Sequence, residues 1–433
     1  MDTTSKTIEL NDILNNPEFR IEHASLPGSP GLKQKKAFED FRKKGLPGGR
    51  TEEYKYTNFS KVLQKNFQLG GSTGVNKEEI TKITTSSIDA YIMVFINGKF
   101  SSEHSHSEEL SEYFTIKNLA DAETELLEKH FATPGSDPDD GFMLINNALA
   151  ENGAFIHIKR NKVVPKPIHL LFITDAKSGN VFIQPHNIII CEENAQADII
   201  SSFHTLGSES SFNNIVSEIY LYENSNLTSY TIQNDTDNAH QVNHNIVHQI
   251  GKSNFSTATF TINGAVVRNN LNIILKSEYS EAKLNGLFLI NGQSHTDNYT
   301  LVDHSVPNCY SNELYKGILN DKATGVFNGK IYVRADAQKT NAFQSNKNIL
   351  LSPDATMNAK PQLEIFADDV KCSHGATIGQ LDEEPLFYLR SRGIKESTAK
   401  KLLVLAFAQD VVESIKNESL KEILTDLITK RIN

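Results

Sequence analysis

The sequence predicts a mainly β protein whose core is a parallel β-helix, flanked by an N-terminal α-containing region and a small C-terminal helical domain. From about residue 90 to about residue 380, short runs of Val, Ile, Leu, Phe and Thr alternate with polar residues and are separated by Asn, Ser, Gly and Asp. This pattern is typical of strands joined by turns. A turn-like segment recurs within it, and the last fifty or so residues change to a helical period. The predicted domains are 1–89, 90–381 and 382–433.

The N-terminal region contains one segment that strongly predicts a helix. LKQKKAFEDFRKK (32–44) is rich in helix-forming residues and is followed by Gly45 and Pro47. Glycine and proline at these positions are the usual signals that end a helix.

The β-rich middle of the chain has a loose repeat. A small residue or an asparagine, flanked by polar residues, separates two strand-like runs at Ala195, Asn226, Asn254, Ala282, Ala323 and Ala355. A strand–turn–strand unit of roughly thirty residues predicts a solenoid. A β-sandwich would give turn signals at shorter intervals.

The C-terminal region predicts two longer helices after a short one that Asp382 caps. In 395–416, Leu403, Phe407, Val411 and Ile415 form a stripe, and the run LLVLAFA (402–408) makes the helix apolar on more than one side. Such a helix is expected to leave one surface for a partner. Ser419 and Glu422 have the spacing of a capping box that opens the last helix.

Composition narrows the functional classes. The chain has 53 acidic and 43 basic residues and a formal net charge of −10, which argues against nucleic acid or an anionic membrane as a partner. Three cysteines are too few for a disulfide framework, and the polar start lacks an apolar signal-peptide core. The longest apolar run, LLVLAFA, is far shorter than a membrane span. We therefore expect a cytoplasmic protein. The motifs of nucleotide-binding and hydrolytic enzymes are absent from the sequence.

Two segments combine histidines with strand-like patterns. In HQVNHNIVHQI (240–250), His240, His244 and His248 share one strand face with Val and Ile, which favours packed and hydrogen-bonded histidines over metal ligands. HTDNYTLVDHSVPNC (295–309) contains His295, Asp297, His304 and Cys309. These four have metal-ligand chemistry, but their spacing matches no known metal motif, so a structural role is favoured.

A third segment, VKCSHGATIG (370–379), places Cys372 two residues from His374. On a strand the two Cα atoms would lie ~6.6 Å apart with both side chains on one face. Val370, Ala376 and Ile378 share that face, so the pattern alone places the pair in the core. Two ligands do not complete a tetrahedral metal site. A metal-binding role would require further ligands from elsewhere, and a second subunit is an obvious source.

Three parts of the chain resemble the SufB/SufD family of iron–sulfur cluster assembly scaffolds. These are NILLSPDATMNAKPQLEIFADDVKCSHGATIGQLDEEPLFYLRSRGI (348–394) with the helix after it, HTDNYTLVDHSVPNCYSNELYKG (295–317) and GRTEEYKYTNF (49–59). The segment TNAFQSNKNILL (340–351) has no cysteine, and CSHGAT contains histidine, as in the SufD type rather than the SufB type. The resemblance implies a right-handed parallel β-helix and a non-enzymatic scaffold subunit.

The resemblance also implies partners and sites. The chain would pair with a SufB-like subunit, and its C-terminal helices would recruit a SufC-like ATPase; whether it forms a homodimer when alone is left open. His374, with Cys372, would lie at the subunit interface near a nascent iron–sulfur cluster. That cluster would be transient and confined to the complex, with no cofactor in the isolated chain. The expected partner-binding residues are Arg390, Arg392, Leu402, Leu405, Phe407 and Val412. The alternative function is a β-helix carbohydrate-active lyase or hydrolase, which the absence of Trp disfavours.

Overall fold

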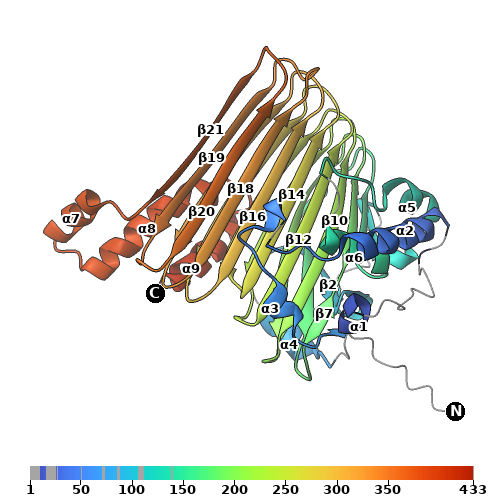
Figure 1. Ribbon diagram of the computed structural model, residues 1–433, viewed down its shortest axis with the longest axis horizontal. Helices are drawn as coiled ribbons and strands as arrows, with labels where there is room; N and C mark the ends of the chain where they lie inside the picture. The colour runs from blue at the N-terminus through green and yellow to red at the C-terminus, as the bar shows by residue number, and fades with distance from the viewer. Residues whose placement is uncertain are drawn as a thin grey trace.

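The computed structural model describes residues 10–15, 26, 28–49, 51–70, 74–84, 88–105, 112–137 and 140–432. Its body is a β-solenoid of about eight turns, with helices beside the early turns and after the last one (Figure 1). From β5 onwards, neighbouring strands in each of the two sheets are parallel. The prediction of a mainly β protein built on a parallel β-helix is therefore confirmed.

The two sheets are formed by alternate strands, so the chain crosses from one to the other in each turn. The first sheet is called here the even sheet, because from β8 onwards its strands are the even-numbered ones. It contains β5 (Ala154–Ile158), β7 (Val181–Ile183), β8 (His186–Cys191), β10 (Ser211–Leu221), β12 (Ala239–Gln249), β14 (Val266–Leu275), β16 (His295–His304), β18 (Thr324–Val333) and β20 (Thr356–Ile365), with β1 (Gln68–Leu69) and β4 (Phe114–Asn118). The second, the odd sheet, contains β6 (Ile168–Asp175), β9 (Gln196–Leu206), β11 (Asn226–Asn234), β13 (Asn254–Asn263), β15 (Glu281–Ile290), β17 (Tyr310–Leu319), β19 (Asn341–Leu350) and β21 (Lys371–Gly379), with β2 (Tyr91–Ile96) and β3 (Lys99–Ser101).

The repeat seen in the sequence has a backbone cause. Asn194 and Asn224 adopt φ of 56° at the turns between strands, and Asp321 adopts 54°. Asparagine and aspartate tolerate this left-handed region better than most residues. A small residue one or two positions later is then buried, as for Ala195 and Ala323, which are fully inaccessible to solvent.

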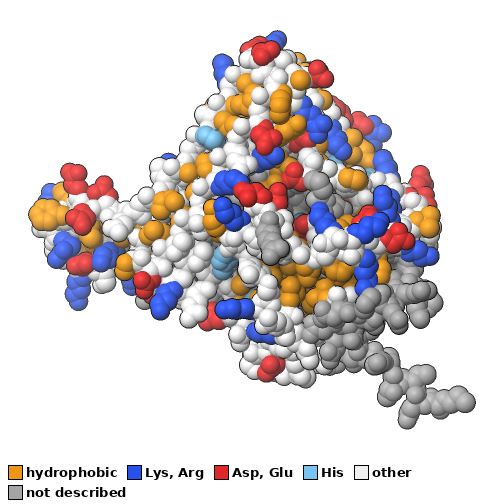
Figure 2. Space-filling model, viewed as in Figure 1, with side chains coloured by type: hydrophobic (Ala, Val, Ile, Leu, Met, Phe, Trp, Pro, Cys, Tyr) orange, Lys and Arg blue, Asp and Glu red, His pale blue; other side chains and the backbone are white. Residues whose placement is uncertain are grey.

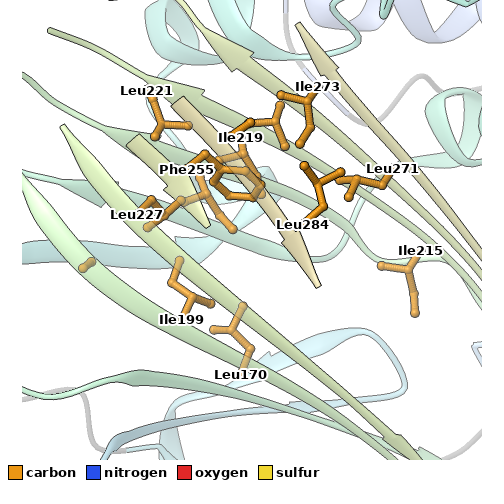
Figure 3. Packing of buried hydrophobic residues seen from close by; sticks show 14 of the residues in the cluster. Leu170, Ile199, Ile215, Ile219, Leu221, Leu227, Phe255, Leu271, Ile273 and Leu284 are labelled. Carbon is orange, nitrogen blue, oxygen red and sulfur yellow. The ribbon is translucent and has the colours of Figure 1, made fainter. Parts of the chain in front are cut away.

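The interior of the solenoid is packed by side chains from both sheets. Leucine, isoleucine and phenylalanine residues of successive strands meet there (Figure 3). At the N-terminal end, the rings of Phe95, Phe172 and Phe203 stack on neighbouring strands with centroids 5.0 and 5.2 Å apart. Stacked identical positions are expected where parallel strands pair in register.

The N-terminal part of the chain, whose helices extend past the predicted boundary at residue 89, covers part of the outward side of the even sheet and, through Ile80, part of the odd sheet. It contains α1 (Leu10–Asn15), α2 (Ser29–Lys44), α3 (Ser60–Leu63), α4 (Lys77–Thr84), α5 (Thr124–His130) and α6 (Gly141–Leu149). The predicted first helix is confirmed as α2, which ends before Gly45 at φ 69°. Phe142 of α6 packs with Phe59 and with Phe212 of β10, so this region has a hydrophobic cluster of its own.

The C-terminal region forms α7 (Glu383–Ser391), α8 (Glu396–Val412) and α9 (Glu418–Arg431). Asp382 caps α7 as predicted, accepting a hydrogen bond from the Glu384 N–H. The predicted capping box is wrong, because Asn417 caps α9 through a bond from the Leu420 N–H, and Ser419 lies inside the helix. Within the described residues, no helix combines the length and apolarity needed to cross a membrane.

Helices α8 and α9 pack on the outward side of the odd sheet. Val411 and Ile415 of the predicted stripe are buried there, with Leu424 and Ile428 of α9. Leu403 and Phe407 are only partly buried. The chain thus covers much of this apolar helix surface itself.

Candidate functional site

The last turn of the solenoid presents free strand edges. Among the described strands, β21 pairs only with β19, and β20 pairs only with β18 (Figure 1). The backbone donors and acceptors on the other edge of each of these terminal strands have no ladder partner in the part of the chain that the structure describes. Every residue of β21 except Cys372 is exposed. This end of the molecule is therefore open to a further strand or a partner surface.

Cys372 and His374 lie on this terminal strand and share one face. The register places Cys372 beside Ala342 and His374 beside Gln344, and both of these β19 residues are buried inside the solenoid. Cys372 is half-buried, and burial raises the pKa of its thiol. His374 is exposed. Core packing, predicted from the pattern, therefore holds in part for Cys372 and is wrong for His374, because no further turn covers the strand.

The pair is an incomplete ligand set. Within the described residues, no group of three or more His, Cys, Asp or Glu side chains is arranged to hold a metal ion. One thiol and one imidazole suit zinc or iron, but tetrahedral sites need four ligands. Ligands from another molecule would have to complete such a site.

The three histidines of the 240–250 segment lie on the outward face of β12, as their shared parity predicts. His240 and His248 are buried, and burial lowers the pKa of each imidazole to about 4. His248 stacks on Tyr220, and His244 Nε2 lies 3.0 Å from Asp140 Oδ2. The prediction that these histidines are packed is confirmed, but hydrogen bonding is wrong for His240, because neither of its ring nitrogens has a partner among the described residues.

The 295–309 segment does not bring its four polar residues together. His295 and Asp297 lie on the outward face of β16, where both meet Thr57. His304 and Cys309 are buried, with His304 Nε2 2.9 Å from Ser311 Oγ and the Cys309 thiol in the interior cluster. The predicted structural role is confirmed.

Asp297 forms a buried ion pair with Arg268, which lines a cavity near the N-terminal segment. Arg268 donates to Asp297, and its guanidinium carbon lies 3.7 Å from the centroid of the Tyr54 ring. A cavity of about 350 Å³ opens beside these residues, with His244 and Tyr299 also in its wall. Arg268 also donates to the Glu53 carbonyl at 2.8 Å, so the pair fastens the N-terminal segment to the sheet.

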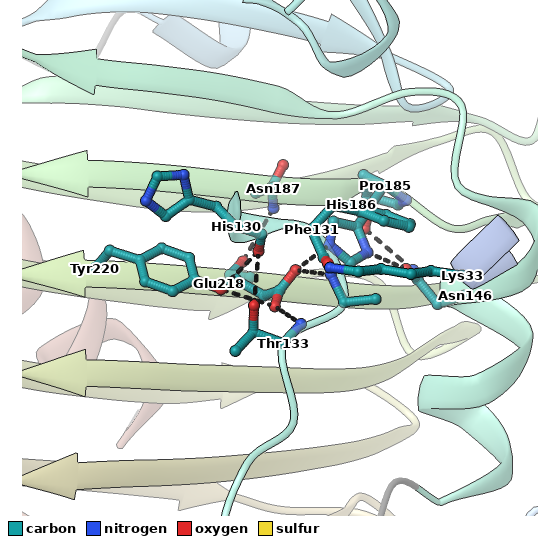
Figure 4. Close-up of polar contacts among 12 residues, drawn as sticks. Lys33, His130, Phe131, Thr133, Asn146, Pro185, His186, Asn187, Glu218 and Tyr220 are labelled. Carbon is teal, nitrogen blue, oxygen red and sulfur yellow. Dashed lines mark hydrogen bonds and ion pairs between the residues drawn. The ribbon is translucent and has the colours of Figure 1, made fainter. Parts of the chain in front are cut away.

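A second buried polar cluster was missed by sequence reasoning. The carboxylate of Glu218 accepts hydrogen bonds from the backbone N–H groups of Ala132 and Thr133, both at 2.7 Å, and lies 2.8 Å from His186 Nε2 (Figure 4). The other ring nitrogen of His186 lies 2.9 Å from Asn146 Oδ1. The cluster is fully paired and holds the 130–133 segment on the sheet, so it is a structural fastener. Its members come from four distant segments, and no local pattern predicts their meeting.

The predicted partner-binding residues differ in exposure. Arg390 and Arg392 are exposed on or just after α7, and Leu402 of α8 is 44 % exposed. Leu405 and Phe407 are half-buried, and Val412 is buried against the chain's own sheet. Val412 is therefore not accessible while α8 keeps this position.

Sequence reasoning did not single out the two large exposed apolar residues of α7. Phe387 is 73 % exposed and Tyr388 is 56 % exposed. Figure 2 shows hydrophobic side chains at the surface of this projecting end, among acidic and basic ones. The same segment, EEPLFYLRSR, was visible in the sequence, but the exposure of its aromatic residues depends on how α7 leaves the solenoid.

Comparisons with known proteins agree with this architecture. Residues 172–407 match the family model described as SUF system FeS cluster assembly, SufBD core domain, and residues 21–170 match the SufBD protein N-terminal region. The chain is 32 % identical to a SufBD family protein of Synechocystis, over 89 % of this chain and 87 % of the relative. It is 30 % identical to the iron–sulfur cluster assembly protein SufD of Escherichia coli, over 90 % of each chain. It is 25 % identical to SufD of Bacillus subtilis, over 88 % of each.

Proposed function

The chain belongs to the SufBD family of iron–sulfur cluster assembly proteins, and from that membership we propose that it is a non-catalytic scaffold subunit of the SufD type. In this proposal it pairs with a SufB-like chain and recruits a SufC-like ATPase. The observation that carries the proposal is the open last turn, where an incomplete pair of metal-ligating side chains lies on a strand with a free edge. Membership of this family favours the scaffold over the alternative function, a carbohydrate-active lyase or hydrolase.

The free edges of β20 and β21 support pairing with another β-helix. An exposed strand edge offers a row of backbone donors and acceptors that a partner strand can satisfy. Lys371 and Ser373, on the outward face of β21, are exposed and would flank such a contact. When no SufB-like subunit is present, a second copy of this chain would bind to the same edge.

Cluster assembly would use the pair on this edge. Cys372 as thiolate and His374 as neutral imidazole would bind iron of the nascent cluster, which is the cargo of the scaffold. The remaining ligands would come from the SufB-like subunit across the interface. All three cysteines are free thiols, which suits assembly in a reducing cytosol.

Docking of the ATPase would use α7 and the exposed side of α8. Phe387, Tyr388 and Leu402 are exposed apolar residues, and Arg390 and Arg392 supply positive charge beside them. Aromatic and arginine side chains are enriched at protein interfaces. A groove that includes Phe387 and Arg390 runs between α7, α8 and the end of the odd sheet.

The experiment that tests the pairing is co-expression with a SufB-like chain, followed by reconstitution with iron and sulfide. His374→Ala should leave the complex assembled and reduce its iron and sulfide content. Lys252→Ala is the control, because Lys252 is exposed in the turn between β12 and β13, away from the last turn of the solenoid. Iron and sulfide loading at the wild-type level in the His374→Ala complex would contradict the proposed site.

The ATPase contact is tested by a double substitution on α7, Phe387→Ala with Tyr388→Ala. Both side chains are exposed, so the chain should fold normally and lose ATPase capture. Leu32→Ala is the control, since Leu32 is 68 % exposed in the N-terminal region. Deleting 396–433 is a poorer test, because it would expose the apolar residues of the odd sheet that α8 and α9 cover.

A further inference from the structure

We propose that Gln344 is a positioning residue for His374. Its side-chain oxygen accepts a hydrogen bond from one ring nitrogen of His374, and this leaves the other ring nitrogen free to bind iron. The inference rests on the proposed function of His374, and it identifies a residue of this chain that would set the geometry of that site.

The strand register brings Glu313, Gln344 and His374 into one column. Gln344 of β19 pairs with Glu313 of β17 on one side and with His374 of β21 on the other. Matched positions on neighbouring strands are ~4.8 Å apart. Glu313 and Gln344 are 2 % and 3 % exposed, so the column lies inside the solenoid and reaches its open end at His374.

The amide of Gln344 is oriented by its first neighbour. Its Nε2 donates a hydrogen bond of 2.9 Å to Glu313 Oε2, which is an acceptor when the carboxyl group is ionised and can remain one when it is protonated. The amide nitrogen of Gln344 thus bonds to the strand of the previous turn. The amide oxygen is the atom that remains for a neighbour on the other side.

That amide oxygen has a vacant position. Gln344 Oε1 is buried and has no hydrogen-bond partner among the described residues. Leaving a buried acceptor unpaired is unfavourable, so a donor that reaches it is favoured. The residue paired with Gln344 in the next strand is His374, whose ring has no hydrogen bond within the described part of the chain. A side-chain rotation of His374 toward the column would satisfy the acceptor.

The opposite sheet leaves room for the side-chain amide of Gln344. A Cβ atom at Gly329 of β18 would overlap the side-chain amide of Gln344 and come within 2.6 Å of the Phe327 ring. Glycine at this position provides the space that the amide occupies. The bond to Glu313 therefore orients the amide, in space that Gly329 leaves open, before any partner or metal arrives.

The chemical consequence concerns the tautomer of the imidazole. A neutral imidazole has one N–H donor and one nitrogen lone pair. Histidines that bind metals usually donate their other N–H to a carbonyl or carboxylate, which fixes the tautomer and the ring orientation. Gln344 would supply such a carbonyl without adding a charge beside Glu313.

The first test observes the imidazole directly in the full-length chain. Ring-¹⁵N histidine labelling, with His374→Ala to assign the signal, should show one tautomer for His374 in the wild type. Gln344→Leu and Gln344→Met remove the acceptor and should both give a mixture of tautomers. Gln362→Leu, on the neighbouring terminal strand, should leave the spectrum unchanged. A His374 signal that is the same in the wild type and in folded Gln344 variants would overturn the inference.

The second test measures cobalt(II) binding to the same proteins. Loss of a partner that orients a metal-ligating histidine typically weakens metal affinity by 10–100-fold, so the Kd of Gln344→Leu should rise at least about tenfold. Added to His374→Ala, the substitution should have no further effect. If His374→Ala leaves iron loading of the complex unchanged, the proposed function fails. If His374→Ala abolishes loading and Gln344→Leu changes neither tautomer nor affinity, the inference alone fails.

Discussion

Replacing Glu313 with Gln should make the protein more stable than the wild type at alkaline pH. Glu313 is 2 % exposed inside the solenoid, and burial raises the pKa of its carboxyl group from the ordinary 4.5 to about 7. The folded chain therefore binds this proton more tightly than the unfolded chain does. The contribution of this proton to the free energy of unfolding is fully present below about pH 4.5 and is lost as the pH rises through about 7.

The size of the effect follows from the shift in pKa. The difference between 7 and 4.5 is 2.5 units, and each unit corresponds to ~1.4 kcal/mol. The full effect is therefore about 3 kcal/mol, of which about 2.5 kcal/mol falls between pH 5 and pH 8. Asp235, whose pKa burial raises to about 6, contributes in the same direction in both proteins and cancels in their difference.

The glutamine side chain that replaces Glu313 in the variant cannot ionise, and its amide oxygen still accepts the Gln344 hydrogen bond. The measurement is urea unfolding of wild type and Glu313→Gln at pH 5 and pH 8. The wild type should lose about 2.5 kcal/mol more of its free energy of unfolding than the variant over this range. Glu209→Gln, an exposed loop carboxylate, is the control and should follow the wild type. A wild-type-to-variant difference that stays constant within about 0.5 kcal/mol would refute the reasoning.

Three further predictions concern single side chains. Arg268→Met should lower the free energy of unfolding by about 3–5 kcal/mol, because Asp297 would remain buried without its cation, and an unchanged urea midpoint would contradict this. Gly329→Ala should cost about 1–3 kcal/mol, since its Cβ would overlap Gln344; equal stability in urea would show that the space is not filled. Cys372→Ser should reduce iron content of the reconstituted complex less than His374→Ala does; an equal loss would make the thiol an essential ligand.

Local pattern was sufficient to predict a β-solenoid with helices near both ends of the chain, but not α5 and α6, which lie within the range 90–381 that was predicted as β. The turns were visible because left-handed backbone at Asn194 and Asp321 selects a narrow set of residues. The start of α9 was missed by two residues, since Ser419 with Glu422 and Asn417 both satisfy capping rules and only the backbone decides between them. The burial of Val412 was also missed, because an all-round apolar helix does not reveal which side its own chain covers.

The site shows why strand parity predicts a shared face but not burial. Parity placed Cys372 and His374 on one face, and the register with Ala342 and Gln344 agrees. In a solenoid, however, an inward-facing residue is buried only if another turn stacks beyond it. β21 is the last strand of its sheet, so the same inward direction that buries Gln344 leaves His374 exposed. Whether a strand is the last one depends on where the chain turns into helix, here after Gly379. The most informative feature of the sequence is therefore the position of the Cys-x-His pair, on the last strand before the pattern changes to a helical period. The last strand of a solenoid has a free edge, so side chains on it are accessible to a partner.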